Sequence, residues 1–233
     1  MKNNQKISIL LSAYNDGNYL SHAIESILNQ TYENFEFLIR NDGSTDETSE
    51  ILDKYKKVDE RIKIFHDSNN IGLTKSLNIL LKESKGSFIA RQDSDDFSFK
   101  ERLKTQVDYL LKKDIDACTT RAFVKQTFKV TPNKSYYLPK NFVMKIKNPY
   151  VHGSLLIKKE VIKKIGGYDE KFYYAQDYKL MSDLIRNGYV LKIIKVPLYV
   201  LNQGDNISTN FSEDQRYFAD CVKKNLTPER VKQ

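Results

Sequence analysis

Short apolar runs alternate with amphipathic segments along the first hundred residues of the chain. Four runs have the length and composition of buried strands, at residues 7–13, 35–39, 62–65 and 87–90. Three segments between them carry apolar side chains at helical spacing, at residues 17–29, 46–55 and 73–81. Strands that alternate with helices over short connections predict an α/β fold, in which helices cover both faces of a largely parallel sheet.

Polar residues follow three of these strands at the point where each strand ends. They occupy residues 12–17, 40–46 and 91–96. Because parallel strands end at the same edge of a sheet, we expect these segments to lie together, where α/β proteins bind ligands. Taken alone, residues 41–46 are more typical of a turn and a capped helix start, with Ser44 or Thr45 near the cap. The agreement of three strand ends favours a binding site.

Three carboxylates, Asp93, Asp95 and Asp96, stand within four positions directly after the apolar run 87–90. Residues 93–96 are called the acidic turn below. Like charges this close repel one another unless a hard cation or a ligand gathers them, and carboxylate oxygen is a preferred ligand of such cations. We therefore place the chemistry of the protein at the acidic turn.

Composition limits the class of protein. At 233 residues and 40% hydrophobic content, the chain can bury the core of one large domain, or of a domain with a subdomain. It has no uncharged apolar run of about 18 residues, and its N-terminus lacks a signal-peptide pattern, which predicts a soluble cytoplasmic protein. Two cysteines far apart in sequence, Cys118 and Cys221, predict reduced thiols rather than a disulfide framework.

The net charge of +8 is distributed unevenly. Residues 1–120 hold 17 Lys and Arg against 20 Asp and Glu, whereas residues 121–233 hold 21 against 10. Residues 121–164, called the basic block below, contain 11 basic residues and a single acid, Glu160. Such a block is typical either of a solvated surface or of a face for anionic lipids or phosphate-bearing substrates. No basic-aromatic motif accompanies it, so we expect no binding of nucleic acid.

Six short elements, in order along the chain, resemble those of glycosyltransferase family 2, whose members have the GT-A fold, use nucleotide-sugar donors and invert the anomeric centre. The matching elements are residues 12–15, 26–32, 41–46, 69–72 with Asn78, 93–96, and 166–169 followed by Gln176 and Asp177. The resemblance extends over residues 7–206. It implies a nucleotide-sugar-binding half (7–97, Rossmann-like) and an acceptor-binding half (98–206) around one continuous mixed sheet, within a single catalytic domain (1–206), followed by a helical tail (207–233).

The resemblance assigns the donor diphosphate to the acidic turn. Asp93 and Asp95 match the family's Asp-X-Asp motif, which holds Mn²⁺ or Mg²⁺ while the metal bridges two phosphates. Asp95 is expected to be the direct ligand, with Asp93 nearer the ribose or the metal's waters and Ser94 also at the donor. Asp96 is expected either to support the ligands or to cap the following helix, and we favour the cap.

Base recognition is implied at the ends of the first two strands. Asp42 matches the acid that bonds the imide edge of uracil, and Ala13, Tyr14 and Asn15 match the wall against which base and ribose lie. Asn41 departs from the family, which commonly has a second acid there. An amide offers both donor and acceptor groups, so other nucleotides stay open, although uridine is favoured.

Two cations, Arg61 and Lys75, are candidates for base or phosphate contact. A solvated helix face explains Lys75 equally well. In the segment after residue 197, the Arg or His often found in the family is absent, and the only polar candidates are Asn202, Gln203 and Asn206.

On the acceptor side, Asp177 matches the family's catalytic base, with Gln176 in place of the usual Glu. The alternative for Asp177 is an acid favoured by the dipole at the start of a helix. His152 matches a segment on the acceptor side near the donor phosphates, although a structural hydrogen bond explains it equally well. Residues 212–225 predict an amphipathic helix, which either packs on the domain or docks to a membrane or a second subunit.

These assignments imply a metal-dependent inverting glycosyltransferase, either hexosyl- or N-acetylhexosaminyl-. It would move a sugar to a hydroxyl of a glycan or lipid-linked acceptor in bacterial cell-surface polysaccharide synthesis, such as O-antigen or capsule. It would act at the inner face of the cell membrane, in peripheral contact through the basic block or the C-terminal helix. A nucleotidyltransferase usually has a Gly-rich basic loop after its first strand, where this chain has residues 14–17. A non-catalytic nucleotide-binding relative stays open because of Asn41 and the short C-terminus.

Overall fold

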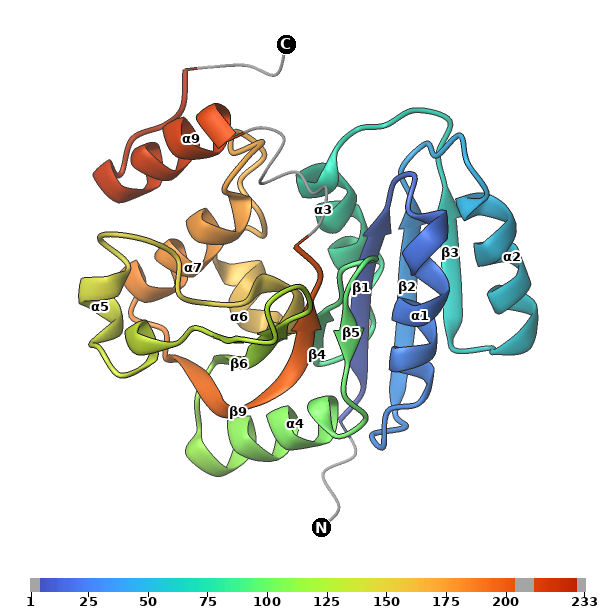
Figure 1. Ribbon diagram of the computed structural model, residues 1–233, viewed down its shortest axis with the longest axis horizontal. Helices are drawn as coiled ribbons and strands as arrows, with labels where there is room; N and C mark the ends of the chain where they lie inside the picture. The colour runs from blue at the N-terminus through green and yellow to red at the C-terminus, as the bar shows by residue number, and fades with distance from the viewer. Residues whose placement is uncertain (1–4, 204–211, 230–233) are drawn as a thin grey trace.

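The computed structural model describes residues 5–203 and 212–229, and Figure 1 shows their arrangement. The strands are β1 (Ile7–Ala13), β2 (Phe35–Asn41), β3 (Ile62–His66), β4 (Phe88–Arg91), β5 (Phe97–Ser98), β6 (Ala117–Val124), β7 (Val130–Thr131), β8 (Leu156–Lys158) and β9 (Leu191–Leu201). They form one sheet in the order β3-β2-β1-β4-β8-β6-β9-β5, with β7 paired to β6. The expected continuous sheet is confirmed.

The first half of the sheet is parallel and the second half is mixed. β1 pairs in parallel with β2 and β4, and β2 pairs in parallel with β3. β8 runs antiparallel to β4 and β6, β6 and β9 are parallel, and β5 closes the order antiparallel to β9. The predicted α/β class with a mixed sheet is therefore confirmed, and the carboxyl ends of β1, β2 and β4 share one edge.

Helices cover both faces of the sheet. They are α1 (Gly17–Leu28), α2 (Thr48–Val58), α3 (Leu73–Glu83), α4 (Arg102–Lys113), α5 (Lys140–Val143), α6 (Lys159–Lys164), α7 (Gln176–Arg186) and α9 (Ser212–Lys224), with the 3-10 turns η1 (Lys134–Tyr136) and η2 (His152–Ser154). Alternate residues of β1 point to opposite faces. Ile9 packs in the core that contains Ile24 of α1, whereas Leu10 packs in the core that contains Leu77 of α3.

The start of α2 lies two residues later than the pattern predicts. Asp46 precedes the helix and accepts the backbone N–H of Thr48 on Oδ1 at 3.1 Å and that of Gly17 on Oδ2 at 3.1 Å. Burial would raise the pKa of the Asp46 carboxyl, but hydrogen bonds from the Thr48 side chain and from these two N–H groups outweigh it and lower the pKa. Asp46 thus joins the starts of α1 and α2 beside the site.

The C-terminal helix α9 buries its apolar stripe against the domain. Phe218 and Val222 pack in one cluster with Phe172 and Tyr178, beside α7. Of the two expectations for this helix, packing on the domain is therefore the one observed for its apolar residues. Across residues 5–203 and 212–229, no helix has both the length and the apolar character that crossing a bilayer requires.

Candidate active site

Side chains and backbone groups join the polar segments at the carboxyl ends of β1, β2 and β4. Ser94 donates from Oγ to Oδ2 of Asp16 at 2.6 Å, which links the acidic turn to the end of β1. The Asn15 backbone N–H donates to Oγ of Ser44 at 3.0 Å, and Oδ1 of Asn15 accepts the N–H of Thr45 at 2.9 Å. The structure thus brings the three predicted strand ends together into one site.

Negative charge is concentrated at the acidic turn. Burial raises the pKa of the Asp95 carboxyl to about 7, and the charges of Asp93 and Asp16 add to the effect. Burial raises the pKa of Asp96 as well, again with a contribution from Asp93. Asp16 is part of this cluster although the sequence pattern did not single it out; its position directly after β1 was the available signal.

The residues of the acidic turn fit a divalent cation. They offer only oxygen donors, the ligands of Mg²⁺ and Mn²⁺, and the raised pKa of Asp95 reflects a charge that a cation would neutralise. Within the described parts of the chain, no group of three or more His, Cys, Asp and Glu side chains is placed to hold a metal ion. Mg²⁺ is usually held by one or two carboxylates together with substrate phosphates and waters. The turn therefore suits a cation shared with a phosphate-bearing ligand.

The buried guanidinium of Arg91 contacts Asp93. The Arg91 side chain is 1% exposed; its Nη2 donates to Oδ1 of Asp93, and its Nη1 donates to the carbonyl oxygens of Leu10 and Gln92. Arg102, also buried, donates from Nη1 to the carbonyl oxygen of Arg91 at 3.0 Å. Arg91 therefore holds one oxygen of Asp93 in place. Its position at the end of an apolar strand, next to the acids, was the only sign of this role in the sequence.

Asp96 does not cap a helix. The next helix, α4, begins at Arg102, after β5, and Asp96 instead accepts the backbone N–H of Asn202 on Oδ1 at 2.7 Å. Tyr199 lies beside it and accepts the Asp93 N–H at 3.1 Å. The preference for a cap was therefore wrong, because β5 separates Asp96 from α4. Asp96 instead joins the acidic turn to the end of β9.

The residues expected to recognise the base lie at this edge. Asp42 is 2% exposed, and its Oδ1 and Oδ2 accept the N–H groups of Ile71 and Gly72 at 3.0 and 2.9 Å. Asn41 is also buried and accepts the Ser44 N–H on Oδ1 at 3.0 Å. Each carboxylate oxygen has a second lone-pair site, so Asp42 keeps acceptor capacity while it fixes the loop.

Tyr14 and Lys75 are placed to reach a ligand at the same edge. The Tyr14 ring is about half exposed directly after β1, whereas Ala13 at the end of that strand is buried. Lys75 is exposed in the first turn of α3. Contact between Lys75 and the donor stays a prediction.

Arg61 lies at the opposite edge of the sheet. It precedes β3, forms an ion pair with Asp59 at 2.7 Å and stacks over the ring of Phe35 at the start of β2, 4.2 Å from the ring centroid. It also donates to the carbonyl oxygen of Leu28, at the end of α1. The expectation that Arg61 contacts the donor is therefore corrected, because parallel strands carry their starts and ends to opposite edges.

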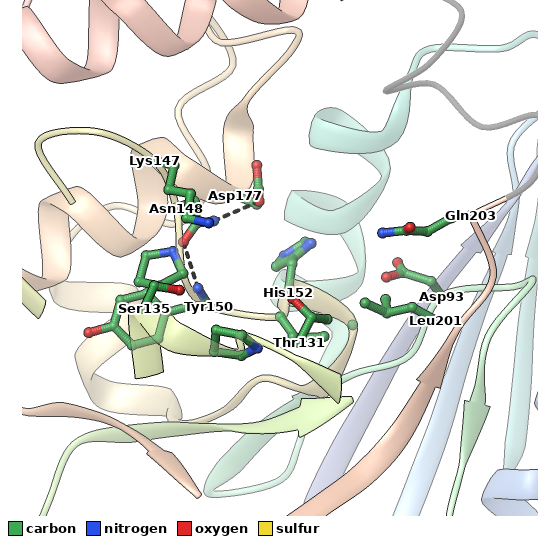
Figure 2. A pocket seen from close by; sticks show the side chains of 14 residues that line it. Asp93, Thr131, Ser135, Lys147, Asn148, Tyr150, His152, Asp177, Leu201 and Gln203 are labelled. Atoms are coloured by element: carbon green, nitrogen blue, oxygen red, sulfur yellow. Dashed lines mark hydrogen bonds between the residues drawn. The ribbon is translucent and has the colours of Figure 1, made fainter. Parts of the chain in front are cut away.

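A cavity of ≈ 260 Å³ connects the acidic turn with Asp177, the residue expected to act as the catalytic base. Its lining residues are Asp93, Thr131, Pro132, Ser135, Lys147, Asn148, Pro149, Tyr150, Val151, His152, Gly153, Asp177, Leu201 and Gln203. Figure 2 shows Asp93 and Gln203 on one side of His152, and Asp177 with Asn148 on the other. Gln176 is half-buried and is not among these described lining residues. The cavity therefore brings together Asp93 and Asp177, which are far apart in sequence.

Asp177 is held by an asparagine that sequence reasoning missed. It lies in the first turn of α7, and its Oδ2 accepts a hydrogen bond from Nδ2 of Asn148 at 2.8 Å (Figure 2). The Tyr150 N–H donates to Oδ1 of Asn148 at 3.0 Å and fixes the amide in turn. The hydrogen bond from Asn148 engages Oδ2, which leaves Oδ1 of Asp177 to accept a proton. Asn148 lies within the lysine-rich basic block, where nothing in the sequence distinguishes it from a surface residue.

His152 has a hydrogen-bonding role in this cavity. Its Nε2 lies 2.8 Å from the hydroxyl oxygen of Tyr168, and the two rings meet edge to face. Burial lowers the pKa of the imidazole to about 4, and the positive charge of Arg91 acts in the same direction. His152 is therefore neutral at physiological pH, which suits it to hydrogen bonding rather than to charge stabilisation.

The end of β9 closes the site from the other side. Gln203 lines the cavity, and its N–H donates to Oε1 of Gln126, while Nε2 of Gln126 donates to Oδ1 of Asn202. Asn206 lies outside the described residues. Lys125, next to Gln126, acts electrostatically on Asp95, and its positive charge opposes part of the rise that burial causes in the pKa of that carboxyl. It is a further cation near the acidic turn, hidden in the basic block.

The sequence matches the family described as Glycosyl transferase family 2 over residues 8–166. An uncharacterized glycosyltransferase of Haemophilus influenzae is 31% identical over 97% of this chain and 75% of its own length. The O-antigen biosynthesis glycosyltransferase WbnJ of Escherichia coli is 35% identical over 75% of this chain and 69% of its own length.

Two solved structures have the same fold. TarS of S. aureus, in complex with UDP-GlcNAc, aligns with a TM-score of 0.78 at 19% identity, over 93% of this chain and 65% of that chain. The mannosyltransferase PcManGT of Pyrobaculum calidifontis, in complex with GDP-Man and Mn²⁺, aligns with a TM-score of 0.73 at 16% identity, over 96% and 66%. At these identities the likeness is one of fold. The chain thus spans slightly less than two thirds of both aligned chains.

Proposed function

The chain belongs to glycosyltransferase family 2, and from that premise we propose that it transfers a hexosyl or N-acetylhexosaminyl group from a nucleotide-sugar to a hydroxyl of a glycan or lipid-linked acceptor. Uridine is the favoured base. One observation carries the proposal: a single cavity reaches from the acidic turn at Asp93 to the carboxylate of Asp177. Transfer needs a site for an anionic leaving group and a base for the acceptor, and the cavity joins candidates for both.

On the donor side, Asp95 with Asp93 would hold Mn²⁺ or Mg²⁺ against the diphosphate. When bound, the cation neutralises the negative charge that develops on the leaving diphosphate. The buried Arg91 orients Asp93 through a hydrogen bond to its Oδ1, and the bond from Ser94 to Asp16 fixes the turn against β1. Tyr14 offers an exposed ring to the base, and Asp42 offers buried carboxylate oxygens at the end of β2.

On the acceptor side, Asp177 would act as general base. The acceptor oxygen bonds to the anomeric carbon as its proton passes to Oδ1 of Asp177, and the bond from that carbon to the phosphate oxygen breaks, leaving its electron pair on the diphosphate. Attack opposite the leaving group inverts the anomeric centre. Asn148 holds the other oxygen of Asp177, so the carboxylate keeps one orientation.

The relatives support the class of donor and the pathway. TarS is described with UDP-GlcNAc, PcManGT with GDP-Man and Mn²⁺, and WbnJ as an O-antigen biosynthesis enzyme. These descriptions favour a nucleotide-sugar, a divalent cation and a role in bacterial cell-surface polysaccharide synthesis for this chain. The neutral His152 and the residue Lys147 would line the path of the acceptor.

A donor screen tests the proposal. Purified protein is mixed with UDP- and GDP-sugars, with Mn²⁺ or with a chelator, and both thermal stabilisation and slow hydrolysis of the donor are scored. We expect at least one nucleotide-sugar, of uridine in the favoured case, to stabilise the protein only when Mn²⁺ is present. The Asp95→Asn variant, which keeps the shape of the side chain, should lose that response. A response to no donor, with or without metal, would contradict the assignment.

A further inference from the structure

Residues 133–147 present large apolar and basic side chains to solvent together. Tyr137, Leu138, Phe142 and Ile146 are 70%, 46%, 55% and 58% exposed. Lys134, Lys145 and Lys147 are exposed in the same segment. Isolated apolar residues are common on protein surfaces, but four within ten positions form a patch of the kind that marks an interaction site. The side chains of Lys134, Tyr137, Leu138, Phe142, Lys145 and Ile146 are called the docking face below.

The helical geometry of this segment keeps the apolar residues outside. Phe142 of α5 and Ile146 of the turn that follows it are spaced by four, which places them on one side of the chain, and Leu138 lies just before the helix. α5 continues past Val143 through the N–H of Ile146, which donates to the Val143 carbonyl oxygen at 2.9 Å. Val143 itself is 3% exposed and supplies the inner side of the turn. The docking face is thus a second apolar surface, separate from the contacts that hold α5 on the domain.

The segment is fixed in shape. Nζ of Lys140 donates to the carbonyl oxygens of Ser135, Tyr136 and Leu138, and lies over the Tyr136 ring. Burial lowers the pKa of Lys140, in keeping with this structural role. The ion pairs found in the described parts of the chain include neither Lys134 nor Lys145. Within the described residues, the charges of these two lysines are therefore available to an outside partner, as is that of Lys147 at the edge of the cavity.

The docking face adjoins the cavity of the candidate active site. Ser135, Lys147 and Asn148 belong to the same stretch of chain and line that cavity (Figure 2). Figure 1 places α5 at one end of the long axis of the molecule and α2 at the other. A partner on the docking face would therefore lie beside the opening through which an acceptor reaches Asp177.

Charge identifies the partner. The basic block has 11 cations and one acid, so a second copy packed symmetrically on this face would set lysines against lysines. A polyanion alone would leave Leu138, Phe142 and Ile146 without an apolar environment. An anionic lipid surface suits both the apolar and the basic side chains. The boundary between headgroups and acyl chains accepts apolar side chains, and the headgroup phosphates attract lysines. The apolar stripe of α9 is already buried, so this helix does not offer the same combination.

We infer that the docking face binds the surface of an anionic lipid membrane, with Phe142 and Ile146 entering the headgroup region and Lys134 and Lys145 facing anionic phosphates. Binding to lipid does not depend on the sugar chemistry. Only its consequence rests on the proposed function: a lipid-linked acceptor would be presented directly to the cavity.

Vesicle co-sedimentation tests this inference on the full chain. Phosphatidylcholine vesicles with and without phosphatidylglycerol are compared, at low and high salt. We expect binding to the anionic vesicles that weakens as salt is raised, and little binding to neutral ones. The variant Lys134→Gln/Lys145→Gln should bind at least about tenfold more weakly, because each lysine near such a surface contributes roughly fivefold. Phe142→Ser/Ile146→Ser should also weaken binding, and high salt should then release that variant almost completely.

A matched control uses the opposite end of the molecule. Lys57 and Val58 of α2 are exposed in the same way, and Lys56→Gln/Lys57→Gln and Val58→Ser should bind vesicles as the unmodified protein does. Thermal unfolding of every variant checks that the fold is kept. Equal binding by the docking-face and α2 variants, or none to anionic vesicles, would overturn the inference. So would a dimer in solution that only the docking-face variants dissociate, because a second copy would then occupy the face. Donor-dependent stabilisation, measured in parallel, reports separately on the proposed function.

Discussion

Asn148 donates a hydrogen bond to Asp177 over 2.8 Å, between a loop of the basic block and the first turn of α7. Asn148 is itself held by the Tyr150 N–H, so one loop that is distant from α7 in sequence sets the orientation of the carboxylate. A hydrogen bond to one oxygen leaves the other to accept a proton. This relationship makes Asn148 a positioning residue for the proposed base.

Asn148→Ala should lower turnover while donor binding stays unchanged. The Asp177 carboxylate would lose its fixed orientation, and misplaced catalytic groups cost rate rather than affinity for a separate substrate. We expect donor hydrolysis with Mn²⁺ to slow by roughly tenfold, at unchanged thermal stabilisation by the donor. Asn141→Ala, an exposed asparagine in α5, is the control and should behave as the unmodified protein does. Equal rates for the two variants would show that Asn148 does not position the base.

Asp177→Asn should nearly abolish transfer to the acceptor or to water. A general base contributes about 10²–10⁴ in rate, and an amide cannot take the proton. Donor binding should be almost unaffected, because Asp177 lies on the acceptor side of the cavity, across from Asp93. Rates and binding are both measured with the donor that the screen identifies. Substantial turnover in this variant would remove Asp177 from the mechanism.

The metal-free protein should lose stability as pH rises toward neutrality, in part through Asp95. Burial raises the pKa of Asp95 from its usual 3.8 to about 7, so the folded state holds this proton more tightly than the unfolded chain does. The resulting stabilisation is present below 3.8 and is lost between 3.8 and about 7. The difference in Tm between unmodified protein and Asp95→Asn should change across that window; each kcal/mol corresponds to roughly 2–4 °C for a chain of this size. A difference that does not vary with pH would contradict the origin assigned to the shift.

Gly153→Ala should displace Asp93 of the acidic turn, because the added methyl group would overlap with its carboxylate. A Cβ at residue 153 would lie 2.5 Å from Oδ2 of Asp93 and 2.3 Å from the Tyr199 hydroxyl oxygen, both too close for an undisturbed contact. We expect a loss of about 1–3 kcal/mol in the free energy of unfolding, as for other overpacked sites, and weaker Mn²⁺-dependent donor binding. Urea denaturation and calorimetric titration measure the two effects. Unchanged donor binding would show that Asp93 tolerates displacement.

Asp42→Asn should weaken binding of uridine donors by roughly tenfold, through loss of an acceptor at the base. Because Asp42 also holds the N–H groups of Ile71 and Gly72, inorganic pyrophosphate with Mn²⁺ is the control ligand. Base recognition predicts that pyrophosphate binding is kept, whereas a purely structural role predicts that both ligands bind more weakly. Lys82→Ala, in the exposed last turn of α3, is the matched surface variant and should bind both ligands as the unmodified protein does.

The first half of the fold could be predicted because β1, β2 and β4 are buried on both faces and their sequences are mostly apolar. The second half could not be read in the same way. β5 and β7 have two residues each, and the buried Thr119 and Thr120 interrupt the apolar run of β6. The antiparallel insertion of β8 between β4 and β6 depends on tertiary packing, which a local hydrophobic pattern does not report.

The candidate site was predictable where residues follow strand ends. The acidic turn and Asn41 are examples, since strand direction alone brings them to one edge. Arg61 was misplaced because it precedes a strand instead of following one. The roles of Arg91 and Asn148 could not be predicted. Arg91 is buried, and Asn148 contacts a residue that is distant in sequence. A local sequence pattern does not distinguish such polar residues from those on the surface.

Calorimetric titration of UDP, with GDP in parallel, measures whether the acidic turn binds a diphosphate through a cation. Three proteins are compared in the presence of Mn²⁺ or a chelator: the unmodified chain, Asp95→Asn and Asp177→Asn. We expect the unmodified chain and Asp177→Asn to bind the nucleotide only with Mn²⁺, and Asp95→Asn to lose this binding. Equal binding with and without Mn²⁺, or undiminished binding by Asp95→Asn, would contradict this expectation.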